Sequence, residues 1–137
     1  MTKKILVVDP DAQFTESFGL KLTERGYLVK CEQSGEKGLA SIPTYRPDLV
    51  FVERTLPDMD SDQFLSGVRY PMSKPNKDVP IVVIGSRAKD KEFLEIHNNG
   101  ADYVIEKPFT DISAFRIVDY LIGDISDEER ERLEALI

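Results

Sequence analysis

Short apolar runs recur along the chain, and each is bounded by residues that favour turns. Three runs are continuous and rich in β-branched side chains, at residues 5–8, 49–52 and 81–84. Such runs are typical of strands buried on both faces of a parallel sheet. Two weaker strands are expected at residues 27–32 and 103–106, each shortly after a glycine. The pattern therefore predicts five strands.

Apolar residues at helical spacing fill the intervals between these strands. In the first interval, Phe14, Phe18 and Leu22 recur every four residues and form one apolar stripe. Asp11 precedes this helix as a candidate N-cap, and Gly26 follows it where a C-terminal cap would stand. Further helices are expected at about 35–42, 61–70, 88–98 and 111–122. The alternation predicts an α/β fold, a doubly wound five-stranded parallel sheet with helices on both faces.

The end of the chain is acidic and carries one more helix signal. Ser126 and Glu129 form a capping-box pattern, and Leu133, Leu136 and Ile137 give the following residues an apolar side. We therefore expect a domain over residues 1–123, followed over 124–137 by an acidic helix or the start of a linker.

Composition narrows the classes of function. The chain has 137 residues and a net charge of −7, which disfavours nucleic-acid binding. Its single cysteine, Cys31, excludes a disulfide framework and a cysteine-rich zinc site. We see neither a secretory signal nor an apolar run long enough to span a membrane, so a cytoplasmic location is expected.

Charged residues follow the predicted strands at the ends where such folds carry their chemistry. Asp9 and Asp11 follow the first strand, Glu53 ends the third, and Lys107 follows the fifth. Carboxylates that face a lysine could hold a divalent cation and a phosphoryl oxygen. We place Asp9 and Asp11 in this acidic pocket, although the position of Asp11 favours the alternative role of a helix cap.

Several segments together resemble the receiver domain of bacterial two-component response regulators, which is CheY-like. The resemblance covers about residues 3–123. It implies a flavodoxin-like fold with strand order 2-1-3-4-5, a cis peptide bond between Lys107 and Pro108, and magnesium bound by an acid pair after the first strand. It also implies an aspartate at the end of the third strand that accepts a phosphoryl group from a histidine kinase. The segments that carry it are Lys4–Asp9, Gly26-Tyr27, Ser34–Glu36, Arg46–Val50, Leu56–Asp60, Pro80–Ile84, Gly100–Asp102 and Lys107–Thr110.

The chain departs from this family at four chemical positions. The phosphoacceptor position holds Glu53, and the second acid of the metal pair is Pro10. The Ser/Thr switch position holds Gly85, and the aromatic switch position holds Val104. Glutamate extends the reach of a carboxylate by about 1.5 Å, and a misplacement of about 1 Å can cost a hundredfold in phosphoryl transfer. We therefore predict an atypical receiver, not an enzyme, that acts by protein–protein interaction without normal aspartyl phosphorylation.

Two alternatives remain for the chemistry. One is a regulator still phosphorylated on Glu53 or on the nearby Asp58 or Asp60. The other is a small phosphatase that uses Asp9, because Asp9-Pro10-Asp11 superficially resembles a haloacid-dehalogenase nucleophile motif. No cofactor is expected. Magnesium binding, with Asp9 and Glu53 as candidate ligands, is expected to be weakened.

The resemblance also implies where partners bind. In the family, output passes through the face made by the fourth helix, the fifth strand and the fifth helix. Signalling proteins are the expected partners, including a histidine kinase or an output domain, and a homodimer is a further expectation. The residues expected on this face are Lys89, Lys91, Glu92, Glu95, Tyr103, Glu106, Asp111, Arg116 and Asp119.

Overall fold

Five parallel strands form one sheet in the order β2-β1-β3-β4-β5, as predicted. The computed structural model describes residues 2–72, 74–86, 95–96 and 99–137. The strands are β1 (Lys4–Val8), β2 (Leu28–Glu32), β3 (Leu49–Glu53), β4 (Ile81–Ser86) and β5 (Tyr103–Lys107).

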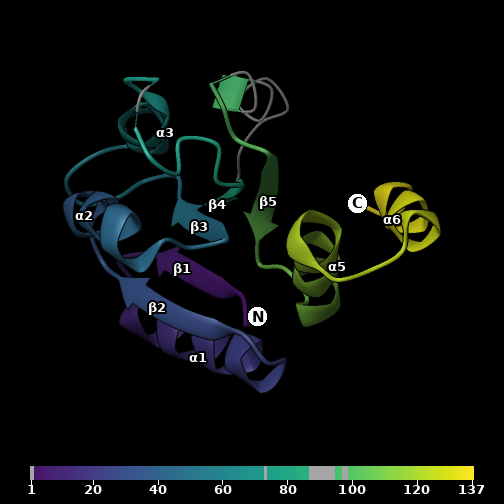
Figure 1. The fold of residues 1–137 in the computed structure, drawn as a ribbon. Coiled ribbons are helices and arrows are strands. Elements are labelled where there is room, and N and C mark those ends of the chain that lie inside the picture. The colour runs from purple at the N-terminus through teal and green to yellow at the C-terminus, as the bar shows by residue number, and fades with distance from the viewer. Residues whose placement is uncertain (1, 73, 87–94, 97–98) are drawn as a thin grey trace.

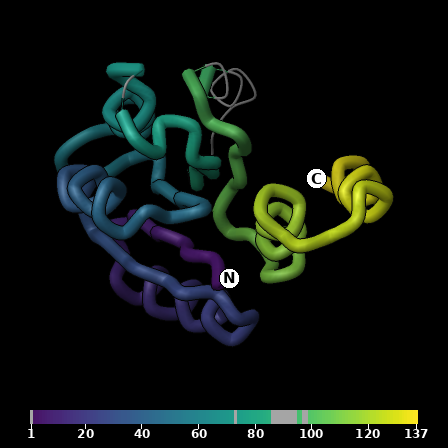
Figure 2. Tube along the Cα trace, in the orientation of Figure 1, coloured from purple at the N-terminus to yellow at the C-terminus, as the bar shows by residue number. Residues whose placement is uncertain are grey.

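Helices cover both faces of the sheet (Figure 1). α1 and α5 pack on one face, and α2 and α3 pack on the other. The path of the chain between the two layers can be followed in Figure 2. The helices are α1 (Ala12–Glu24), α2 (Gly35–Tyr45), α3 (Ser61–Arg69), α5 (Asp111–Ile122) and α6 (Asp127–Glu134).

Side chains of the central strands alternate between two apolar cores, because successive residues of a strand point to opposite faces. On β1, Ile5 and Val7 pack toward α1 and α5, whereas Leu6 and Val8 pack toward α2 and α3. All four are fully buried. This explains why the strands are continuous apolar runs rather than alternating ones.

α2 is longer than predicted. The sequence predicts that it ends near Ile42, and a proline such as Pro43 disfavours a helix interior. The helix instead continues through Pro43 to Tyr45 and ends at Arg46, whose φ of 53° is left-handed. The backbone N–H of Arg46 donates to the carbonyl of Ile42 and closes the last turn.

The predicted fourth helix, at about 88–98, lies largely outside the described residues. Glu95 and Ile96 are helical, and Ile96 is buried in the core on the α2–α3 side. Lys89, Lys91 and Glu92 also lie outside the described residues.

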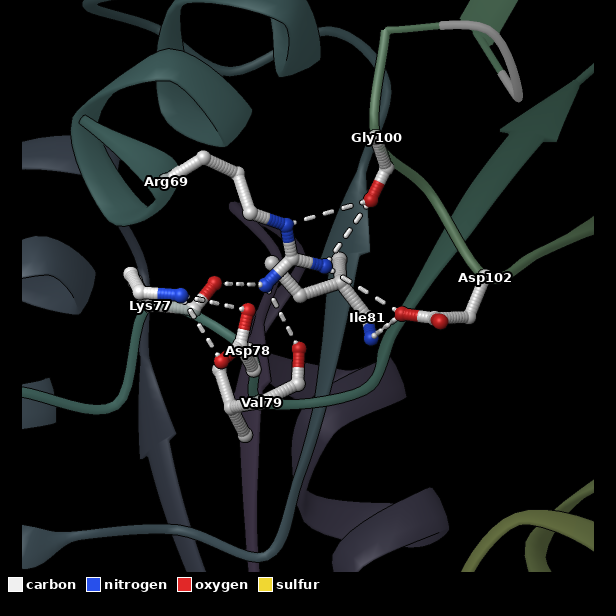
Figure 3. Close-up of polar contacts among 7 residues, drawn as sticks. All are labelled: Arg69, Lys77, Asp78, Val79, Ile81, Gly100 and Asp102. Carbon is white, nitrogen blue, oxygen red and sulfur yellow. Dashed lines mark hydrogen bonds and ion pairs between the residues drawn. The ribbon is translucent and has the colours of Figure 1, made fainter. Parts of the chain in front are cut away.

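At the amino ends of the strands, Arg69 joins three segments of the chain (Figure 3). Its guanidinium donates to the carbonyls of Lys77 and Val79, at 2.6 and 2.7 Å, and to that of Gly100, at 2.8 Å from Nη2 and 3.3 Å from Nε. Nη2 also donates to the Asp102 carboxylate at 3.2 Å. Arg69 therefore fixes the loops that lead into β4 and β5, at the end of the sheet opposite the site described next.

Candidate functional site

The fold brings Asp9, Glu53 and Lys107 together at the carboxyl ends of β1, β3 and β5. The ammonium of Lys107 lies 2.7 Å from Asp9 Oδ2 and 3.2 Å from Glu53 Oε2. The prediction that these side chains converge is confirmed. The Lys107–Pro108 peptide bond is cis, also as predicted.

Asp9 is the most deeply buried acid of the site, with 1% of its surface exposed. One carboxylate oxygen accepts from Lys107, and the other accepts from the backbone N–H of Asp11 at 2.9 Å. Its own backbone N–H donates to the carbonyl of Glu32 at 3.0 Å. Both the carboxylate and the backbone N–H of Asp9 are thus hydrogen-bonded, and Lys107 compensates the negative charge of the carboxylate.

Lys107 is held by contacts with two kinds of group. Besides the two carboxylates, its ammonium lies 3.9 Å from the centroid of the Phe14 ring, a cation–π contact. Burial alone would lower the pKa of Lys107, but the hydrogen bond and charge of Asp9, with the charge of Glu53, outweigh burial and raise it. Lys107 therefore keeps its positive charge in the folded protein.

Glu53 is the residue of this site whose ionised form is least stabilised by its surroundings. Burial raises the pKa of its carboxyl, Lys107 partly offsets this, and the nearby Asp9 raises it further. Oε2 is buried and, despite its distance of 3.2 Å from the ammonium, accepts no hydrogen bond among the described residues. Because burial penalises the charged form more than Lys107 compensates for it, the neutral form of Glu53 is favoured more than that of an ordinary glutamate.

Asp11 belongs to the start of α1. Its exposed carboxylate accepts from the backbone N–H groups of Gln13 and Phe14, at 3.0 and 3.2 Å. It is the N-cap of the helix. The placement of Asp11 in the acidic pocket is therefore wrong, and its interpretation as a cap is correct. Its side chain is directed to its own helix because the first amides of a helix lack other partners.

Asp58 and Asp60, the other two candidate phosphoacceptors, also use their carboxylates to cap helices. Asp58 accepts from the backbone N–H groups of Gly35 and Glu36, both at 2.9 Å, and these bonds lower the pKa of its carboxyl. Asp60 is the N-cap of α3 and forms a capping box with Gln63. The contact from Asp58 to α2 could not be read from the sequence, because it joins residues that are more than 20 positions apart.

The two switch-equivalent positions lie on neighbouring strands. Gly85 of β4 is opposite Glu106 of β5 and is buried. Val104 is partly buried against the core on the α2–α3 side, whereas Tyr103 packs against the opposite core. Neither position therefore offers a hydroxyl or an aromatic ring near Lys107.

Two acids predicted for the output face point elsewhere. Asp111 pairs with Lys21 at 3.1 Å, and Asp119 pairs with Arg25 at 3.2 Å, so both side chains point to α1. Their assignment to the side of α5 that adjoins β5 is wrong. The sequence places both on helix α5 but does not fix which side of the helix faces which neighbour.

A groove adjoins Lys107 between α1 and the start of α5. Its volume is about 580 Å³, and three phenylalanine rings form its apolar part. Phe109 meets Phe14 and Phe18 edge to face, at 6.0 and 5.5 Å between centroids. Phe14 and Phe18 are predicted from the sequence as members of the apolar stripe of α1, and the contact of Phe14 with Lys107 is not predicted.

The sheet order and its helical layers define a CheY-like, flavodoxin-like fold. Residues 5–119 match the family model of the response regulator receiver domain, so the chain belongs to this family. None of the described helices is long and apolar enough to cross a membrane.

Named relatives agree with this assignment. The chain is 30% identical over 105 residues to the transcriptional regulatory protein KdpE of Mycobacterium tuberculosis, which is 77% of this chain and 44% of that protein. It is 33% identical over 109 residues to the response regulator MprA of Mycolicibacterium vanbaalenii, at 80% and 46% coverage. A two-component response regulator from Clostridium difficile shares the fold, with a TM-score of 0.82, 24% identity, and coverage of 90% of this chain and 98% of that one. The chain spans less than half the length of KdpE and of MprA.

Proposed function

We propose that this chain is an atypical receiver that acts through protein–protein contact and does not pass through an aspartyl phosphate. The observation that carries the proposal is the double contact of Lys107, at 2.7 Å from Asp9 and 3.2 Å from Glu53. The longer side chain of Glu53 reaches the lysine directly. The carboxyl group of Glu53 thus lies beside the cation that would otherwise meet a phosphoryl group.

Magnesium fits this group of residues poorly. Pro10 removes one acid of the family pair, and Asp11 caps α1. The two remaining carboxylates already share an ammonium. Among the described residues, no cluster of three or more acids, histidines or cysteines could hold a metal ion. Because magnesium needs near-octahedral oxygen coordination, we propose that the site does not use it.

The alternative acceptors support the same conclusion. Asp58 and Asp60 both use their carboxylates to cap helices. Phosphorylation of either would replace a cap that accepts backbone hydrogen bonds. The second candidate function, a phosphorylated regulator, is favoured only by the relatives KdpE and MprA, which are named as regulators.

The partners we propose are signalling proteins, with a histidine kinase or an output domain among them, and a second copy of the chain as a further candidate. The described residues that we propose for the output face are Glu95, Tyr103, Glu106 and Arg116, three of which are charged, with both signs. A mixed, partly polar surface suits a protein partner.

Intact mass after incubation with acetyl phosphate and magnesium tests the proposal. The chain should gain no phosphoryl group. The Glu53→Asp variant and the Glu53→Asp/Pro10→Asp double variant, which restores the second acid, report how much of the family chemistry remains. Labelling of the unaltered chain would overturn the proposal, and Asp58→Asn and Asp60→Asn variants would then locate the acceptor.

A further inference from the structure

The groove beside Lys107 is large enough to hold a small molecule. Its volume of about 580 Å³ falls within the range that small-ligand sites span. Its apolar part is formed by the rings of Phe14, Phe18 and Phe109 together with Pro108. Phe18 is buried, whereas Phe14 and Phe109 are only half-buried and leave part of their surface accessible. A ligand in the groove would therefore meet aromatic surface.

The three rings form a cluster that is fixed to the sheet. Phe14 and Phe18 are stacked at 5.4 Å between centroids, and Phe109 meets both edge to face. Phe18 also contacts Phe51 of β3 edge to face, at 5.0 Å. Aromatic rings favour edge-to-face and offset contacts with one another. The cluster is therefore suited to an additional aromatic ring, supplied by a ligand.

An ion pair at the same groove supplies charges of both signs. Lys21 and Asp111 line the groove and lie 3.1 Å apart, with side chains that are 43% and 49% exposed. An exposed ion pair contributes little to stability, so its partners can turn to a ligand at small cost. Lys107 also lines the groove, but it is already paired with Asp9 and Glu53. Lys21 and Asp111 are thus the charges that the groove offers to a ligand.

These two charges together restrict the charge of the ligand. A lone carboxylate near Lys21 would also meet the like charge of Asp111, and a lone ammonium near Asp111 would meet that of Lys21. Like charges placed together are costly and disfavour the wrong partner. A group that carries both charges side by side can direct its carboxylate to Lys21 and its ammonium to Asp111. The charged group of a free α-amino acid has this property.

We propose that the groove is a binding site for a free aromatic α-amino acid. Its ring would lie against Phe14 and Phe109, and its carboxylate and ammonium would pair with Lys21 and Asp111. Binding involves no phosphoryl group and no metal, so this proposal does not depend on the proposed function.

Four probes test the class of ligand by NMR titration of the full chain. Phenylalanine carries both charges, whereas 3-phenylpropionate and 2-phenylethylamine carry one each on a similar phenyl body. Phenylalanine should bind at least about fivefold more tightly than either, the effect of one exposed ionic contact, with shifts in α1 and residues 107–111. Leucine, with the same charged group but no ring, should also bind more weakly. Equal or tighter binding of any other probe, no saturable shifts with phenylalanine, or shifts elsewhere would overturn the proposal.

Variants of the ion pair test the charge arrangement. Lys21→Gln and Asp111→Asn should each weaken phenylalanine binding about fivefold. Asp111→Asn should at the same time strengthen the binding of 3-phenylpropionate, because the opposing charge is gone. Lys30→Gln is the matched control, since Lys30 is 42% exposed, pairs with Glu32 and lies outside the groove. Equal effects of the Lys21 and Lys30 variants, or an unchanged preference for phenylalanine in Asp111→Asn, would contradict the proposal.

A blocking variant tests the place of binding without removing any proposed contact. Ser17 is exposed on α1 and lines the groove, so Ser17→Trp should fill it and abolish phenylalanine binding. Glu16→Trp, at the preceding exposed residue outside the groove, should leave binding unchanged. Urea unfolding verifies that each variant is folded. Equal binding by the two tryptophan variants would show that the ligand lies elsewhere and would refute the proposal.

Discussion

Lys107 Nζ and Asp9 Oδ2 are 2.7 Å apart, and they join the ends of two strands that do not pair with each other. β3 and β4 lie between β1 and β5 in the sheet. The ion pair therefore spans the carboxyl edge of the sheet and passes beside Glu53 of β3. It is both the centre of the candidate site and a link across the fold.

Replacing Lys107 by methionine should destabilise the protein by about 3–5 kcal/mol at neutral pH, because a buried carboxylate loses its partner. Urea unfolding measures this loss of stability. Lys21→Met is the matched control, since the Lys21–Asp111 pair is 43% and 49% exposed and should cost at most about 1 kcal/mol. Equal losses in the two variants would contradict the role given to Lys107.

Glu53→Gln should change how stability depends on pH. The pKa of Glu53 is raised above its ordinary value of 4.5, chiefly by burial. An acid with a higher pKa in the folded than in the unfolded state makes the protein less stable as pH rises from the unfolded value through the folded one. The variant lacks this loss, so its stability relative to the unaltered chain should increase across that window. Unfolding free energies measured at several pH values check this, with exposed Glu106→Gln as control; a constant difference would refute it.

Gly35→Ala should be destabilising because of Met59. A Cβ at Gly35 would lie 2.5 Å from Met59 Sδ, so the methionine must move. We expect a cost of about 1–3 kcal/mol, as for overpacking elsewhere. The Met59→Ala background should remove most of this cost, which a double-mutant cycle measures. If the two changes are additive, the contact is not the cause. Exposed Glu36→Ala in the same helical turn is the control.

Arg69→Met should destabilise the protein by about 2–4 kcal/mol, since the carbonyls of Lys77, Val79 and Gly100 lose a charged donor. The loss should appear in thermal unfolding, together with faster hydrogen exchange in the loop before β4. Arg132→Met, at an exposed site, should change the stability little. A similar effect of both variants would show that the cluster around Arg69 is not a main support of these loops.

The sequence was sufficient to place Asp9, Glu53 and Lys107 in one site, because the alternation of strands and helices defines which strand ends meet. It also identified Asp11 as a cap from local chemistry alone. It could not show that Asp111 and Asp119 face α1, because this depends on the rotation of α5 about its axis. Nor could it show that Phe14 contacts Lys107, since the two residues are far apart in the chain and meet only after folding.

The reach of Glu53 to Lys107 has a consequence for how such a protein would be controlled. A typical receiver changes its state when a phosphoryl group is added or removed, while the amount of the receiver protein stays constant. With the acidic group supplied by the side chain itself, the proposed state is permanent from the moment of folding. The fraction of partner bound then follows the concentration of this chain and its dissociation constant alone. Synthesis and degradation, on the timescale of gene expression, would thus take the place of a kinase and a phosphatase.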